Sequence, residues 1–220
     1  MSPSNTDISA AIREIGIVAI MRANSSEQLL AAADAVKAGG VNAIEVTMTT
    51  PGALGVIEEA TSRYGDEVIF GVGSVLDPQT ARAAILAGAQ FVVCPTLNLE
   101  TIKMCKRYSV PVVPGAYTPT EVLTAWEAGA DMVKIFPASV GGPPYIKAIL
   151  APLPQVKLVP VGGVNLKTTA DFIRAGSEIV GVGSSLINQK LLEAKEFNTI
   201  SENARLHREE VQKGRNRGNG

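Results

Sequence analysis

The sequence predicts an α/β fold, a (β/α)8 TIM barrel that is preceded by a short N-terminal helix and forms a single domain. Three observations support this prediction. Short, nearly continuous apolar runs alternate along the chain with longer segments of helical spacing. Strands that are separated by helices rather than by hairpin turns form parallel sheets covered by helices. The alternation repeats about eight times in 220 residues, which is typical of a closed barrel.

The apolar runs are the predicted strands. Their composition suits strands that are buried on both faces, because a parallel sheet with helices around it leaves neither face to water. An open doubly wound sheet is the rival arrangement, but it normally carries a glycine-rich turn after its first strand, and Met21-Arg-Ala-Asn24 has no glycine. The predicted strands span residues 17–21, 42–46, 68–72, 91–94, 111–113, 131–135, 157–161 and 178–182.

The segments between the strands carry helix start and stop signals. Ser25, Ser26 and Glu27 are capping residues at the start of one segment. A weak internal repeat, alanine followed by glycine, ends four helices before the even-numbered strands, where glycine supplies a left-handed cap. Helices are predicted over residues 4–15, 25–38, 51–64, 78–87, 99–108, 119–128, 144–150 and 166–175, with a long one from Ser184 or Ser185 onward.

Composition excludes several functional classes. The formal net charge is -1 and no basic stripe interleaved with aromatic residues precedes the tail, so we expect no nucleic-acid partner. No run is long enough to span a membrane and the N-terminus has no apolar signal core, so we expect a soluble, cytoplasmic protein. Cys94 and Cys105 are then reduced thiols. Residues 1–6 and about 212–220 are predicted to be flexible ends of the one domain, 1–220.

Lys134 is a charged residue within the apolar run of the sixth predicted strand. Because side chains alternate along a strand, Met132, Lys134 and Phe136 share one face, which would point toward the barrel axis. Burial disfavours an ammonium ion, so a buried lysine can present a free amine that attacks a carbonyl group. The alternative is a lysine whose stem passes its apolar neighbours and reaches water.

Glu45 is a carboxylate in the second predicted strand, and two interpretations of it stay open. It could face solvent or pair with a helix lysine. If it faces the axis near Lys134 instead, burial would raise its pKa and the ammonium ion would lower it. Such a pair titrates as a coupled unit and can move protons on and off a carbinolamine or the carbon beside an imine.

Two glycine-containing turns follow the seventh and eighth predicted strands. Gly162-Gly163 and Gly183-Ser184 are each expected to lead from a strand into a helix N-terminus, where free amide donors and the helix dipole favour an anion. This is the usual phosphate position in such barrels. A pair of glycines could also serve only to permit a tight turn. Two such turns at neighbouring strands favour phosphate binding.

Other polar side chains at strand ends complete the candidate site, and one expected ligand is missing. Arg22 follows the first strand, Thr47 the second, Ser74 the third and Pro95 the fourth. The sole histidine, His207, lies late in the chain and is expected at the surface. No histidine-ligated metal site is therefore predicted, and no cofactor.

Five motifs of this sequence occur together and in order. They are Ile44-Glu-Val-Thr47, Phe70-Gly-Val-Gly-Ser-Val-Leu76, Val133-Lys-Ile-Phe-Pro137, Val159-Pro-Val-Gly-Gly-Val164 and Gly181-Val-Gly-Ser184. Together they resemble the 2-keto-3-deoxy-6-phosphogluconate (KDPG) aldolase family, which includes 4-hydroxy-2-oxoglutarate (KHG) aldolases and phosphogalactonate-specific members. The resemblance implies a class I aldolase, commonly a homotrimer, that reversibly splits a phosphorylated keto acid into pyruvate and glyceraldehyde 3-phosphate. It also implies Entner-Doudoroff carbohydrate metabolism.

The same resemblance implies roles for individual residues. Lys134 is similar to the Schiff-base lysine and Glu45 to the general acid/base. The remaining positions would bind substrate: Phe136 and Pro95 as pocket walls, Ser74 near the pyruvyl group, Thr47 after Glu45, Arg22 at the anion, and Gly162, Gly163, Gly183 and Ser184 at the phosphate.

Two departures from the family pattern bear on the substrate. Thr49 stands where many members have an arginine, whose anion contact Arg22 would take over. Val161 stands where many KDPG-cleaving members have a threonine, and valine is similar to galactonate-specific relatives. A phosphogalactonate aldolase is therefore one alternative. A second is a phosphosugar isomerase or synthase, with Glu45 as the base and Lys134 as an electrostatic stabiliser. A third is a non-catalytic barrel that binds a phosphorylated ligand.

Overall fold

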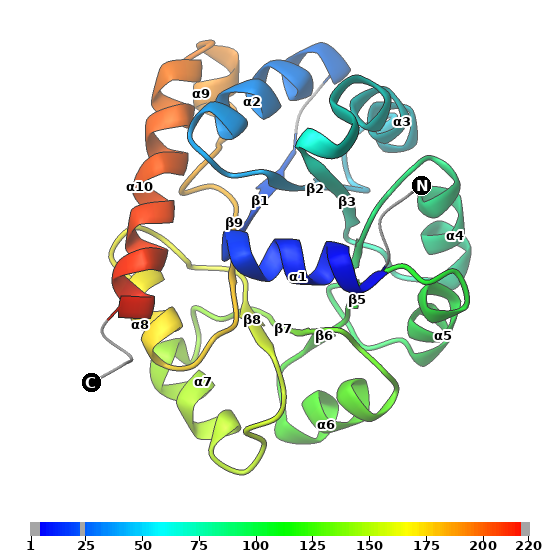
Figure 1. Cartoon of the computed structure of the whole chain (residues 1–220), viewed down its shortest axis with the longest axis vertical. Helices are drawn as coiled ribbons and strands as arrows, with labels where there is room; N and C mark the ends of the chain where they lie inside the picture. The colour runs from blue at the N-terminus through cyan, green and yellow to red at the C-terminus, as the bar shows by residue number, and fades with distance from the viewer. Residues whose placement is uncertain (1–4, 23–24, 217–220) are drawn as a thin grey trace.

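The computed structural model describes residues 5–22 and 25–216, in which a curled arrangement of parallel strands is surrounded by helices (Figure 1). All eight predicted strands are confirmed within a few residues, and the fifth is divided into two. The strands are β1 (Ile17–Met21), β2 (Ala43–Thr47), β3 (Ile69–Gly73), β4 (Val92–Val93), β5 (Val112–Val113), β6 (Gly115–Ala116), β7 (Val133–Ile135), β8 (Leu158–Pro160) and β9 (Val180–Val182).

The strands pair into two parallel sheets rather than one continuous ladder. One sheet has the order β5-β4-β3-β2-β1-β9 and the other the order β6-β7-β8. Pro114 separates β5 from β6, because proline has no N–H group to give to a ladder. At the junction between β8 and β9, an isolated parallel bridge joins Val161 to Gly181. The amide of Glu178 also donates to the carbonyl of Leu158 there, at 2.9 Å. The two sheets therefore adjoin at both of their ends.

Helices cover the outer face of the strands. Ser25 caps α2 by accepting a hydrogen bond from the amide of Gln28, and the glycines of the alanine–glycine repeat end their helices with φ between 83° and 102°. The predicted left-handed caps are confirmed. The helices are α1 (Asn5–Ile15), α2 (Ser26–Ala38), α3 (Ala53–Tyr64), η1 (Gly65–Glu67), α4 (Pro78–Leu86), α5 (Leu99–Arg107), α6 (Pro119–Glu127), α7 (Gly142–Leu150), α8 (Thr169–Arg174), α9 (Gln189–Glu193) and α10 (Phe197–Asn216).

The C-terminal part differs from its prediction. No helix begins at Ser184 or Ser185, because residues 184–186 form a turn, and Lys195 with φ of 54° separates the short α9 from α10. α10 continues past residue 212 to Asn216, since Val211 is buried and Arg215 donates hydrogen bonds to two carbonyls of α1. Residues 5 and 6, within the predicted flexible N-terminus, belong to α1. The predicted flexible residues 1–4 and 217–220 lie outside the described residues.

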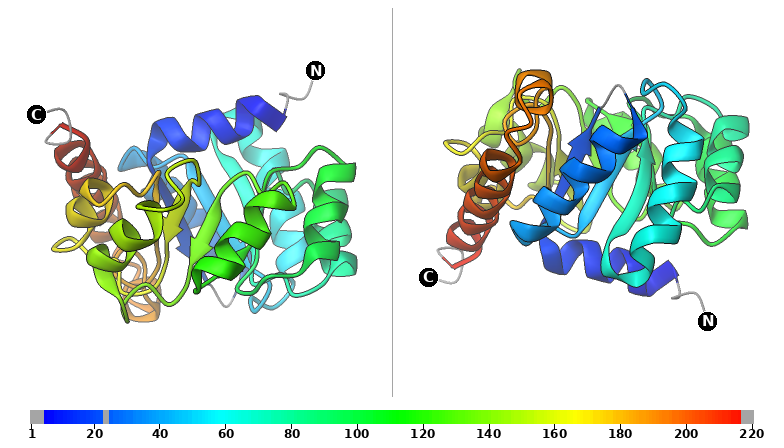
Figure 2. Two further views of the ribbon diagram at one scale, coloured as in Figure 1. Left: turned by 90° about the horizontal axis from the view of Figure 1, so that it is seen from below. Right: turned by 90° about the horizontal axis from the view of Figure 1, so that it is seen from above.

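The strands separate two apolar clusters, and α1 closes one end of the inner cluster. Alternate residues such as Ile17 and Ala19 of β1 pack outward against the helices, whereas Val18 and Ile20 point inward. α1 lies across one end of the strands (Figure 2) and adds Ile12 to the inner cluster. The open end, where the strands have their carboxyl ends, is the one left for a ligand. None of the helices within the described ranges is long and apolar enough to cross a membrane.

Candidate active site

Lys134 lies in the middle of β7, between Gly115 of β6 and Val159 of β8. Its strand neighbours Val133 and Ile135 pack into the outer cluster, so Lys134 points inward as the alternation predicts. The residue is only 6% exposed. The structure thus places an amine inside the ring of strands rather than at the water surface.

Glu45 lies on β2 and is also buried, with 3% of its surface exposed. The alternative interpretation, a solvent-facing glutamate, is therefore wrong. Its carboxylate fits closely over β3: a Cβ atom added at Gly73 would lie 1.7 Å from Oε1 of Glu45. The carboxylate thus occupies the space that a side chain at position 73 would need.

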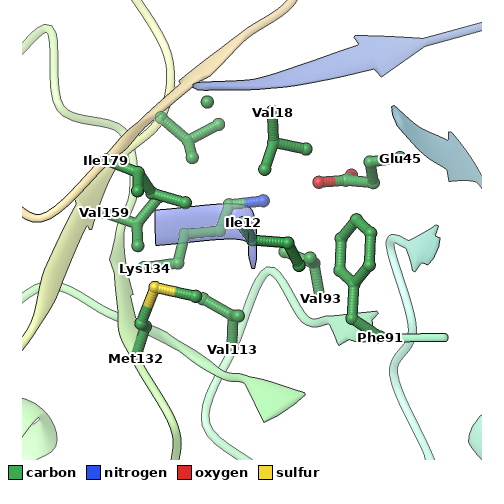
Figure 3. Close-up of a pocket in the computed structure, with 12 residues that line it drawn as sticks. Ile12, Val18, Glu45, Phe91, Val93, Val113, Met132, Lys134, Val159 and Ile179 are labelled. Atoms are coloured by element: carbon green, nitrogen blue, oxygen red, sulfur yellow. The ribbon is translucent and has the colours of Figure 1, made fainter. Parts of the chain in front are cut away.

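The two charged groups point toward one another across an interior cavity (Figure 3). Within residues 5–22 and 25–216, no direct hydrogen bond or ion pair joins Lys134 to Glu45, although both side chains line the same cavity. Apart from these two side chains, the walls are apolar. They comprise Ile12, Val18, Phe91, Val93, Val113, Met132, Val159, Val161, Ile179 and Gly181.

Burial raises the pKa of Glu45, and the positive charges of Lys134 and Arg22 oppose this shift only partly. A carboxyl group with a raised pKa exchanges protons more readily near neutral pH than an ordinary glutamate does. The arrangement combines a buried amine with a buried proton carrier. Such a pair suits chemistry at a carbonyl carbon.

A second, open pocket adjoins the interior cavity at the carboxyl ends of the strands. The two cavities share Val161 and Gly181 as lining residues. Gly162 and Gly163 have φ of 86° and 78°, a left-handed conformation that favours glycine. The predicted residues that line this pocket are Arg22, Phe136, Gly162, Gly163, Gly183 and Ser184. We call it the anion pocket, because Arg22 is its cationic side chain.

The expected helix N-termini are absent from the anion pocket, within the part of the chain that the structure describes. α8 begins at Thr169 and α9 at Gln189, so turns follow both glycine motifs. One of these turns is closed by the amides of Leu186 and Ile187, which donate to the carbonyl of Gly183. An anion would therefore meet turn amides rather than the end of a helix dipole.

Sequence reasoning missed two residues that line this pocket and one buried residue that does not line it. Asn165 and Ser185 line it, and their position next to the two glycine motifs was the available signal. His207, predicted at the surface, is completely buried. His207 follows Ile200 by seven residues, which places both on one face of α10. Because this spacing is typical of the covered face of a helix, it could have indicated that His207 is buried.

Three predicted substrate-binding residues line neither cavity. Thr47 is buried and its hydroxyl lies 2.9 Å from that of Thr49. Ser74 follows β3 with a left-handed φ of 60°. Pro95 contributes its backbone, which lies 2.3 Å from a Cβ atom built at Gly115. Within the described residues, no group of three or more histidine, cysteine, aspartate or glutamate side chains could hold a metal ion.

A family model, KDPG and KHG aldolase, matches residues 8–203, which span both cavities. The chain belongs to this aldolase family. As a KDPG/KHG aldolase family member it is an enzyme of the lyase class. Its α/β architecture is that of solved KDPG aldolases, and the resemblance inferred from the five sequence motifs is confirmed.

Individual relatives support the same assignment. The chain is 38% identical to the 2-dehydro-3-deoxy-6-phosphogalactonate aldolase of Escherichia coli K12, over 79% of this chain and 85% of that protein. It is 32% identical to the 2-dehydro-3-deoxy-phosphogluconate aldolase of Pseudomonas aeruginosa, over 91% and 90%. A KDPG aldolase of Legionella pneumophila, solved with pyruvate captured as a covalent carbinolamine intermediate, is 28% identical and superposes with a TM-score of 0.84, over 93% and 98%.

Proposed function

We propose that the protein is a class I aldolase that reversibly cleaves 2-dehydro-3-deoxy-6-phosphogluconate to pyruvate and D-glyceraldehyde 3-phosphate through a Schiff base on Lys134. One observation carries the proposal: a buried lysine faces a buried glutamate across an apolar cavity that adjoins the anion pocket. The covalent pyruvate of the Legionella relative supports the chemistry. The pyruvyl end would occupy the interior cavity and the phosphate the anion pocket.

The proposed reaction begins when the Nζ lone pair of Lys134 attacks C2 of the keto acid. The carbonyl oxygen takes a proton, the resulting carbinolamine loses water, and a protonated imine forms. A base removes the proton of the C4 hydroxyl, the C3–C4 bond breaks, and its electron pair moves into the imine to give an enamine. Protonation at C3 and addition of water at C2 then release pyruvate and restore the amine.

Glu45 is the proposed proton carrier of these steps. The carboxyl group stands across the cavity from the amine, and its raised pKa suits it to receive and return protons. Because no direct hydrogen bond joins it to Lys134 within the described ranges, it would act through the substrate hydroxyl or a water molecule. The protonated imine is itself the electron sink, so this route uses no cofactor.

The deciding test is borohydride reduction in the presence of pyruvate, followed by location of the adduct by mass spectrometry. We expect the adduct on Lys134 in the wild type and in Lys157→Met, a matched control on the neighbouring segment, but not in Lys134→Met. Lys134→Arg separates the imine from an electrostatic role, since an isomerase or synthase that needs only a cation would keep some activity. An unlabelled Lys134 would contradict the proposal.

Cleavage of 2-dehydro-3-deoxy-6-phosphogalactonate is the second candidate activity. Val161, which borders both cavities, has no hydroxyl to contact the keto acid at the point where the two C4 epimers differ. The Escherichia coli relative supports it as well. Cleavage rates on the two epimeric phosphorylated keto acids would decide between them. Activity on 4-hydroxy-2-oxoglutarate is a further part of the proposal.

Three structural predictions belong to the same proposal. We propose that the two sheets act as one closed eight-stranded barrel, supported by the Val161–Gly181 bridge and by the continuity of β5 with β6. We also keep the homotrimer and the cytoplasmic location as predictions. Analytical ultracentrifugation of the purified protein would test the trimer.

A further inference from the structure

His207 is a buried histidine on α10 that the proposed mechanism does not use. Its ring lies between the two loops of the anion pocket and is fully shielded from solvent. Nδ1 lies 3.0 Å from Oγ1 of Thr169, and Nε2 lies 3.1 Å from Oγ of Ser185. One side chain thus contacts both chain segments that follow β8 and β9.

Both ring nitrogens of His207 have a hydroxyl partner. The hydroxyl of Thr169 also lies 2.8 Å from the carbonyl of Asn165, to which it donates. A neutral imidazole carries a hydrogen on one nitrogen and a lone pair on the other, so it donates to one partner and accepts from the other. The ring therefore links Thr169 and Ser185 in its uncharged form.

The neutral form is the one that burial favours. Burial lowers the pKa of His207 to about 4, although hydrogen bonding to the Ser185 backbone and the charge of Glu210 act in the opposite direction. The ring therefore stays uncharged at neutral pH. It serves as a donor on one side and an acceptor on the other, without adding charge beside the pocket.

The two contacts reach the pocket wall from different loops. Thr169 holds the carbonyl of Asn165, and Asn165 and Ser185 both line the anion pocket. Because the Ser185 hydroxyl is hydrogen-bonded to His207, its loop can present backbone amides to an anion. Those amides bind well only if their loop is held still relative to the glycine loop opposite.

We propose that His207 is a positioning residue for the anion pocket, which holds the loops 162–165 and 183–185 at the spacing that accepts the phosphate group of the substrate. This inference rests on the proposed function of that pocket. His207 would act on phosphate binding alone, because it touches neither Lys134 nor the interior cavity within the described residues.

The test compares His207→Asn and Ser185→Ala with the wild type on a phosphorylated keto acid and on unphosphorylated 4-hydroxy-2-oxoglutarate. Asparagine can still form a hydrogen bond with Thr169 but leaves Ser185 without its partner. We expect each variant to raise KM for the phosphorylated acid about 3- to 10-fold, the range for one lost hydrogen bond, with little change in kcat. The double variant should be no worse than His207→Asn alone, because both changes break one contact.

Val211→Ala is the matched control, since it removes buried volume from the same helix far from the pocket. We expect it to lower the melting temperature without changing the ratio of the two KM values. An unchanged ratio in both His207→Asn and Ser185→Ala would overturn the inference. If His207→Asn does not fold, Ser185→Ala decides.

Failure of the proposed function gives a different result. In that case the wild type forms no borohydride adduct with pyruvate, whatever His207 does. The inference is then tested with inorganic phosphate as the probe, by measuring its dissociation constant from thermal stabilisation. Weaker phosphate binding in His207→Asn than in Val211→Ala supports the inference, and equal binding in the two variants contradicts it.

Discussion

The ammonium nitrogen of Lys134 lies 5.0 Å from the centre of the Phe136 ring. The same ring forms a wall of the anion pocket and is 42% exposed. Phe136 therefore stands between the proposed nucleophile and the open end of the site. The π face of the ring attracts a cation. In the proposed reaction, the protonated imine on Lys134 is a cation beside this ring.

We expect Phe136→Leu to reduce kcat by roughly 2- to 5-fold, the equivalent of a partly exposed cation–π contact. Leucine keeps an apolar wall but has no ring to stabilise the protonated imine. Phe136→Tyr keeps the ring and is the control. Single-turnover kinetics with pyruvate trapping would measure the effect, and equal loss in both variants would show that the ring face is not responsible.

Gly73→Ala should abolish most of the activity by displacing the Glu45 carboxylate. The added methyl group would lie 1.7 Å from the position of Oε1, so the carboxylate would have to leave its present place opposite Lys134. Gly55→Ala on α3 is the control, because nothing lies within 4 Å of its added Cβ atom. The helix should tolerate or even gain from that alanine, by about 0.5–1 kcal/mol. Steady-state kinetics and thermal unfolding would separate the two outcomes.

Glu45→Gln should be inactive yet more stable than the wild type at neutral pH. The pKa of Glu45 is raised in the folded protein above its ordinary value of 4.5, so ionisation costs the folded state free energy as the pH rises from 4.5. Glutamine removes that cost. We therefore expect a higher melting temperature than that of the wild type at neutral pH.

The gain for Glu45→Gln should grow between pH 5 and pH 8 in thermal unfolding experiments. Glu59→Gln, an exposed change on α3, should show no such trend. A gain that shrinks as the pH rises would contradict the burial argument, because it would mean that the folded state favours the ionised carboxylate.

His207 should make the protein sensitive to acid. Its pKa is about 4 in the folded protein against 6.5 ordinarily, so the unfolded chain takes up this proton at a higher pH than the folded one. The neutral His207 therefore makes its full contribution to the free energy of unfolding above pH 6.5. As the pH drops toward 4, the free energy of unfolding falls by on the order of 3 kcal/mol.

Urea unfolding at pH 7, 5.5 and 4 would measure this acid sensitivity. His207→Asn should be less stable at pH 7 but lose less stability on acidification. Both proteins contain Glu45, so its titration cancels in the comparison. The same pH slope in the two proteins would show that His207 does not carry the effect.

The strand positions were predictable because burial on both faces leaves a plain apolar signal, and each strand lies within a few residues of its prediction. The inward direction of Lys134 and Glu45 was predictable from the period of two along a strand. The fifth strand was predicted as one, but Pro114 interrupts its ladder. Local sequence patterns therefore predict where the strands lie and which residues point inward.

Residues whose surroundings come from distant segments were predicted less well. His207 was placed at the surface, although Thr169 and Ser185 satisfy its two nitrogens inside the protein. The long helix expected from Ser184 is a turn followed by two helices, because the loop there folds back on Gly183. The chain was predicted to be flexible from about residue 212, yet Arg215 donates hydrogen bonds to two backbone carbonyls of α1.

By itself the sequence determined which segments are strands, that they run parallel, and that a lysine and a glutamate share their inner face, since these properties depend on local periodicity and connection length. Only the tertiary structure decided that the two groups face each other across one cavity and that a glycine on β3 makes room for the carboxylate. It also showed that His207 contacts both Thr169 and Ser185, on the segments that follow β8 and β9. Those relationships depend on distances between segments far apart in the chain, which no local pattern encodes.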